Sequence, residues 1–152
     1  MVNSKSADLP NRRRLDPAAR RLEVIEAAER LLAVEGAQVR VEDVVREANA
    51  GKGTFFVYFP TWDDLLEAIR ARSFDRFRAR LPLPSEVDGP VDWPALMDQL
   101  GEAFMDFNLE LGGLHDVLFH SDFARNRPIP TAEAPPAYLS AMIKAGKEAG
   151  SF

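Results

Sequence analysis

The sequence contains no cysteine, only two histidines and no long hydrophobic run. A chain without cysteine forms neither disulfides nor cysteine-ligated metal sites, and it has no thiol nucleophile. The longest unbroken apolar run, Phe55–Phe59, has five residues, whereas a transmembrane helix needs about 20. No apolar stretch follows the basic triplet Arg12–Arg14, so the N-terminus does not resemble a signal peptide. We therefore expect a cytoplasmic protein with no membrane partner.

The two histidines, His115 and His120, do not form a recognisable catalytic or metal site. A spacing of five residues predicts different faces of one helix, whereas a shared metal needs a spacing of four. Either side chain lies at the surface, in the core or on a polar spot of a ligand cavity. No Ser/His/Asp set can be assembled with Asp116 or Asp122. We therefore expect no enzyme activity, no cofactor and no bound metal.

The net charge of −5 is divided unevenly along the chain. Residues 1–80 carry fifteen Lys and Arg against thirteen Asp and Glu, a net of +2, whereas residues 81–152 carry a net of −7. The excess is strongest in residues 1–21, with a net of +4. A basic arm suits a polyanion such as nucleic acid, although a solvated tail explains the charge as well.

Hydrophobic periodicity predicts an all-α protein. Asp16 and Thr61 stand where N-caps are expected, and Pro17 fits the first position of a helix. Residues 82–94 contain four prolines and predict a linker. The predicted helices cover about 17–35, 41–48, 52–59, 62–81, 93–111, 114–123 and a last segment from 137 onward.

The first sixty residues follow the plan of a helix-turn-helix DNA reader: a helix, a short helix, a tight turn and another short helix. In this plan the second short helix enters the major groove by its N-terminal end, which here reads Gly51-Lys52-Gly53-Thr54. The glycines let the backbone approach the duplex closely. Lys52 and Thr54 are expected to reach phosphates or base edges.

The aromatic run Phe55–Phe59, which follows Thr54, is the only segment whose composition favours a β-strand. It does not alternate and Pro60 truncates it, so we predict a helix. In that helix Phe55 and Phe59 would pack inward and anchor it, while Tyr58 offers its hydroxyl to a phosphate.

Residues 18–70 resemble the DNA-binding domain of the tetracycline-repressor (TetR) family of bacterial regulators. The most specific block is the lysine-glycine-threonine and aromatic cluster Lys52–Pro60, while Ile25–Ala28 and Val41–Val45 match the two preceding helices. The resemblance implies an all-α fold with a three-helix DNA-binding head and a helical regulatory body. The implied divisions are a flexible basic arm over 1–15, a helix-turn-helix domain over 16–62 and an effector-binding domain over 63–152.

The resemblance also implies a function: a homodimeric repressor that a small apolar or aromatic effector releases from a palindromic operator in double-stranded DNA. The effector would move the connecting helix and change the spacing of the two heads. The predicted DNA contacts are Arg40, Gly51, Lys52, Gly53, Thr54, Phe56 and Tyr58, with Arg12, Arg13 and Arg14 in the arm.

Several positions depart from the family pattern. Val39 and Arg40 stand at the place of a threonine that usually caps the second helix. Asn49-Ala50-Gly51 replaces a Gly-Val-Ser turn, Phe56 replaces a phosphate-binding tyrosine, and Trp62 replaces a lysine. We therefore predict fewer or differently distributed phosphate contacts.

The C-terminal part is rich in aromatic and methionine side chains at helical spacing. Such side chains form either the core or the wall of an effector pocket, because pockets between bundle helices are mostly apolar. Periodicity does not separate the two. The residues predicted to bind the effector are Phe104, Phe107, Phe119, Phe123, Tyr138 and Met142.

Family members usually continue past the position of Phe152 with two further helices that form the dimer interface. The resemblance thus implies either a truncated chain or a dimer that uses another surface, such as the amphipathic helix at 93–111. A rival reading is a helical module that binds a small molecule or a protein and never contacts DNA.

Overall fold

The computed structural model describes residues 16–81 and 90–152. These residues form helices joined by turns, without any strand, so the prediction of an all-α fold is confirmed for the described part of the chain. None of the described helices is long and apolar enough to span a bilayer. The helices are α1 (Pro17–Glu35), α2 (Val41–Glu47), α3 (Lys52–Tyr58), α4 (Trp62–Arg78), α5 (Trp93–Leu111), α6 (Leu114–Phe119), α7 (Asp122–Asn126) and α8 (Pro135–Glu148), with a 3₁₀ turn η1 (Gly36–Gln38).

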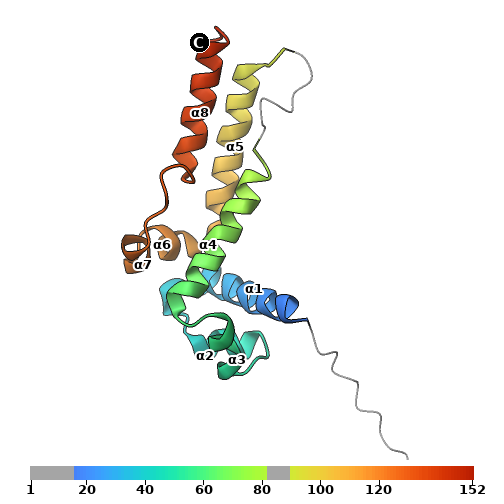
Figure 1. The fold of residues 1–152 in the computed structure, drawn as a ribbon, viewed down its shortest axis with the longest axis vertical. Coiled ribbons are helices and arrows are strands. Elements are labelled where there is room, and N and C mark those ends of the chain that lie inside the picture. Colours follow the sequence, from blue (N-terminus) through green and yellow to red (C-terminus); the bar gives the residue numbers. More distant parts are fainter. Residues whose placement is uncertain (1–15, 82–89) are drawn as a thin grey trace, which may run out of the picture.

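The helices are arranged as a head and a body that α4 connects (Figure 1). We call α1–α3 the head and α5–α8 the body. In the view of Figure 1 the head lies at the lower end, while α5 and α8 run side by side at the upper end. The short helices α6 and α7 lie between them, next to α1 and α4.

The head is built on the apolar face of α1. Val24, Ala28 and Leu32 are fully buried there. Pro17 occupies the first turn of the helix, and Gly36 ends it with a φ of 61° while its N–H donates to the carbonyl of Leu32. The predicted start and stop of this helix are confirmed, although the Asp16 side chain makes no capping hydrogen bond.

The start of α4 is fixed by a reciprocal pair of hydrogen bonds. The Thr61 hydroxyl accepts from the Asp64 N–H at 3.1 Å, and the Thr61 N–H donates to the Asp64 carboxylate at 2.9 Å. This capping box satisfies two backbone donors that a helix start leaves free. The predicted cap at Thr61 is confirmed, and α4 then buries Leu65, Ile69 and Phe77 along one face.

The turn between α5 and α6 lies against α1. Gly112 has a φ of 51°, and the Gly113 N–H donates to the Ala33 carbonyl at 2.9 Å. A Cβ at Gly113 would lie 2.8 Å from the Leu32 carbonyl oxygen, so only glycine fits here without displacement. The predicted helix break is confirmed, and the turn also docks the body on the head.

Four expected boundaries are wrong. α4 ends at Arg78, three residues before the expected end, and the chain continues in a turn. Pro94 lies in the first turn of α5 rather than in a linker, because a helix tolerates proline where the N–H has no partner. The helix expected over 114–123 is two helices, with Ser121 in extended conformation between them. α8 begins at Pro135, two residues before the expected start. The arm 1–15 and the linker residues 82–89 lie outside the described residues.

Candidate nucleic-acid interface

The short helix α3 is anchored by two aromatic side chains. Phe55 and Phe59 are buried, and their ring centroids lie 5.7 Å apart. The guanidinium of Arg21 lies 5.0 Å from the centroid of the Phe59 ring, which ties α3 to α1 by a cation–π contact. The prediction that both phenylalanines pack inward is confirmed. Because this face is buried, the opposite face of α3 is the one that a partner can reach.

The outward face of α3 is formed by two pairs of residues at i, i+4 spacing. Lys52 and Phe56 make one pair, and Gly53 and Val57 make the other, and all four are exposed. A Cβ at Gly53 would meet no atom within 4 Å, so a partner can approach the backbone at Gly53 closely. Val57 is 77% exposed and was not among the predicted contacts, although its spacing from Gly53 could have identified it. Exposed apolar side chains on such a helix suit the methyl group of thymine.

A surface depression between α2 and α3 brings three predicted contacts together. Arg40, Lys52 and Phe56 line it, with Glu42 and Trp62 beside them. The predicted contacts Thr54 and Tyr58 are half-buried and lie outside this depression, and Gly51 and Gly53 are exposed at the start of α3. Arg12, Arg13 and Arg14 lie outside the described residues.

Lys52 is paired with an acidic residue that the sequence reasoning missed. Its Nζ lies 2.6 Å from a carboxylate oxygen of Glu42 on α2. The hydrogen bond from Lys52 is the main cause that lowers the pKa of Glu42, and a backbone hydrogen bond and the charge of Lys52 act in the same direction. A phosphate that binds Lys52 therefore competes with this carboxylate. No sequence pattern reveals the pair, because it depends on how α2 crosses α3.

The turn before α3 is held from α1. Asn49 has a φ of 50°, and its carbonyl accepts a hydrogen bond from Nη2 of Arg20 at 2.8 Å. Arg20 also pairs with Glu23 at 2.9 Å. One arginine of the basic N-terminal segment therefore supports the turn. At the start of α2, the Arg40 N–H donates to Asp43 at 2.9 Å, which leaves the exposed Arg40 side chain without a capping role.

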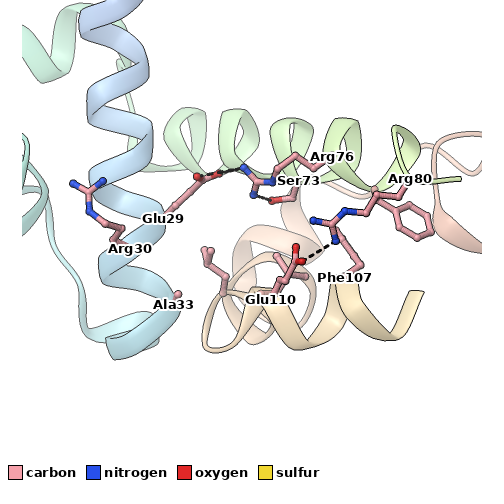
Figure 2. A pocket seen from close by; sticks show the side chains of 11 residues that line it. Glu29, Arg30, Ala33, Ser73, Arg76, Arg80, Phe107 and Glu110 are labelled. Carbon is pink, nitrogen blue, oxygen red and sulfur yellow. Dashed lines mark hydrogen bonds and ion pairs between the residues drawn. The ribbon is translucent and has the colours of Figure 1, made fainter. Parts of the chain in front are cut away.

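Paired charges join the head to α4. Arg72 donates to Glu26 and Glu29 of α1, at 2.9 Å each. Arg76 reaches Glu29 at 3.2 Å, and Arg80 reaches Glu110 of α5 at 2.8 Å. Figure 2 shows the last two pairs in a pocket of about 280 Å³ between α1, α4 and α5. Arg76 and Arg80 in this pocket are therefore paired with glutamates.

A second set of contacts joins the body to the start of α4. Arg127, just after α7, donates to the Asp64 carboxylate at 2.9 Å and to the Asp63 carbonyl at 3.3 Å. Buried Arg70 donates to the Arg127 carbonyl at 2.7 Å and lies over the ring of Phe123. The pKa of Asp64 is lowered, chiefly by the hydrogen bond from the Thr61 side chain and then by that from Arg127.

An apolar pocket of about 270 Å³ lies between α4, α5 and α8. Phe104 is the predicted effector residue that lines it. Phe107, Phe123 and Met142 are buried in the core, and Phe119 and Tyr138 are half-buried against other aromatic rings. The residues that line the pocket are Phe77, Met97, Leu100, Gly101, Phe104, Pro135, Pro136 and Leu139.

The two histidines lie close together, so the expectation that their spacing separates them is wrong. The ring centroids of His115 and His120 are 5.0 Å apart. α6 ends at Phe119, and His120 leaves the helical path that the spacing argument assumed.

Comparison with known proteins finds a family match for the helix-turn-helix segment. Residues 24–69 match the model of the family described as bacterial regulatory proteins, tetR family. A curated relative, an uncharacterized HTH-type transcriptional regulator of Haemophilus influenzae, is 38% identical over 60 residues, which are 39% of this chain and 32% of that protein. The aligned segment thus spans about a third of that relative.

Solved structures share the fold over most of the chain. A putative tetR family transcription regulator from Shewanella sp. PV-4 has a TM-score of 0.63 at 18% identity, covering 86% of this chain and 71% of that one. A TetR-family regulator from Haemophilus influenzae Rd has a TM-score of 0.60 at 22% identity, covering 88% and 72%. The multidrug binding protein EbrR, solved with imidazole, has a TM-score of 0.51 at 24% identity, covering 94% and 84%. The helix-turn-helix segment thus matches the tetR family of bacterial regulatory proteins, and the chain shares its fold with solved TetR-family regulators over most of its length.

Proposed function

We propose that this protein is a transcriptional repressor that binds double-stranded DNA through the outward face of α3. The observation that carries the proposal is the division of α3, which buries Phe55 and Phe59 and exposes Lys52, Gly53 and Val57. A helix held in this way fits the major groove with its N-terminal residues at the base edges. Arg40 and Lys52 supply positive charge for phosphates.

The proposal includes a palindromic operator and a homodimer. Two heads of a dimer meet half-sites about one helical turn, or ~34 Å, apart, so a small change in their spacing releases the DNA. The helix at Trp93–Leu111 offers exposed apolar side chains for an interface, among them Met105 and Leu109. The protein would act in the cytoplasm and associate with the nucleoid when bound to DNA.

Release by a small apolar or aromatic effector is the second part of the proposal. The pocket between α4, α5 and α8 is lined by apolar side chains and includes Phe77 of α4. Because α4 starts at the capping box of Thr61 beside the head, an effector that shifts α4 also shifts the head. The effector must bind the two states with different affinity. EbrR is described as a multidrug binding protein, which suits a pocket of this kind in a protein of the same fold.

A mobility-shift assay with the DNA that flanks the gene tests the proposal. The wild type is expected to shift this DNA in preference to a scrambled duplex, and Lys52→Ala is expected to weaken the shift. Lys147→Ala is the matched control, because it removes the same charge from an exposed position on α8, far from α3. A wild type that shifts neither duplex would favour the rival, a helical module that does not bind DNA.

A further inference from the structure

Among the described residues, one cluster of metal-ligating side chains lies outside the proposed DNA and effector sites. His115 and Asp116 belong to α6, and His120 follows its last residue. One ligand atom from each of the three lies within 4.8 Å of the other two. Two imidazoles and a carboxylate therefore converge on one point at the surface of the body.

The end of α6 explains why residues five apart converge. The His120 N–H still donates to the Asp116 carbonyl at 3.0 Å, but His120 itself has φ −125° and ψ 0°. The next residue, Ser121, is extended. His120 is thus the point at which the chain leaves the helix, and its ring lies beside that of His115 instead of on the opposite face.

The distances fit a metal after a small movement of exposed side chains. Zn–N bonds of about 2.0–2.1 Å require two nitrogens on one ion to lie within about 4.2 Å of each other. His115 Nδ1 and Asp116 Oδ1 are already 3.7 Å apart. Asp116 and His120 are exposed, so rotation of their side chains can close the remaining gap without disturbing the core.

The neighbouring residues leave the side chains of His115, Asp116 and His120 available to bind a metal ion. Among the described residues Asp116 has no ion pair with lysine or arginine, whereas the nearby Asp122 is paired with Arg125. The ring of His115 rests on that of Phe119, with centroids 5.4 Å apart, which restricts its position. A partly fixed first ligand reduces the entropy lost when a metal binds.

We propose that His115, Asp116 and His120 bind one divalent cation of the zinc or nickel class. Imidazole ligands favour Zn²⁺, Ni²⁺ and Cu²⁺, while Mg²⁺ and Ca²⁺ prefer oxygen ligands. Three protein ligands leave further coordination positions for water or another ligand. The site does not depend on the proposed DNA function.

Isothermal titration of the full chain, without an affinity tag, with ZnCl₂ and with NiCl₂ tests the site. The expected result is saturable binding of one ion per chain, with His120→Gln and His115→Gln each weakening it at least about tenfold. Asp122→Asn is the matched control and is expected to bind like the wild type. Circular dichroism melting curves show that each variant is folded. Absence of saturable binding, or wild-type affinity in the double histidine variant, would overturn the proposal.

Discussion

The head and the body bury their side chains to different degrees. In the head, Val24, Leu32 and Phe55 are completely inaccessible to solvent, whereas most core residues of the body, such as Trp93 and Phe107, keep a few per cent of their surface exposed. The body also has an apolar pocket of about 270 Å³ between α4, α5 and α8. The head is thus closely packed around Phe55 of α3, whereas the body leaves an apolar pocket between its helices and α4.

The largest expected effect follows from truncating a ring in the head. Phe55→Ala should destabilise the protein by about 3–5 kcal/mol, because it leaves a cavity under α3. Phe104→Ala in the body removes a ring that is 46% exposed and should have a clearly smaller effect. Urea unfolding followed by circular dichroism measures both. Equal losses of stability in the two variants would contradict the difference in packing between the head and the body.

The next largest effect on stability is expected at Gly113, where the turn of the body contacts α1 of the head. Gly113→Ala places a methyl group 2.8 Å from the Leu32 carbonyl and should destabilise the protein by about 1–3 kcal/mol. Gly101→Ala, in the middle of α5 with nothing within 4 Å of the new Cβ, should stabilise it by about 0.5–1 kcal/mol. Thermal unfolding of both variants checks the signs. A neutral Gly113 variant would show that the turn does not need to lie so close to α1.

The pair of Lys52 and Glu42 predicts a moderate effect on DNA binding. Glu42→Gln should strengthen binding up to about fivefold, since a phosphate no longer competes with the carboxylate. Lys52→Ala should weaken binding and reduce the dependence on salt by about one phosphate contact. Fluorescence anisotropy at several salt concentrations measures both. An unchanged affinity of the Glu42 variant would show that Lys52 does not contact phosphate.

Salt dependence of the wild type tests the departures from the family pattern. Phe56 and Trp62 stand where the family has a tyrosine and a lysine, so the slope of log affinity against log salt should be shallow. The same anisotropy titrations give this slope. A steep slope would mean that other cations, such as those in the arm, replace the lost contacts.

The smallest effect concerns pH. The pKa of Asp64 is lower in the folded state than its unfolded value of about 3.9, so its contribution to stability is present above that pH. It is lost as pH falls through the folded pKa. Asp64→Asn should therefore reduce the loss of thermal stability between neutral and acidic pH. Identical pH profiles for both proteins would show that the contacts with Thr61 and Arg127 add nothing.

Much of the head and the start of α4 were predictable because their signals are local. Capping at Thr61, the stop at Gly36 and the inward faces of Phe55 and Phe59 each follow from spacing within a few residues. The pair of Glu42 with Lys52 and the convergence of His115 with His120 depend on tertiary packing or on where a helix ends. Periodicity could not identify them.

In the body, hydrophobic periodicity predicted the helices and their apolar faces. It could not distinguish core residues from residues that line a cavity. Phe107 and Phe104 are three residues apart on α5, yet one is buried and the other lines the apolar pocket. The difference depends on how α8 packs against α5, and residue spacing does not predict that packing.

The central claim is that the outward face of α3 contacts DNA, and amide NMR of the labelled protein tests it most directly. Titration with the duplex that flanks the gene should shift the amides of Lys52, Gly53 and Val57 first, while those of α8 stay unchanged. Shifts confined to α5–α8, or none at saturating duplex, would contradict the claim.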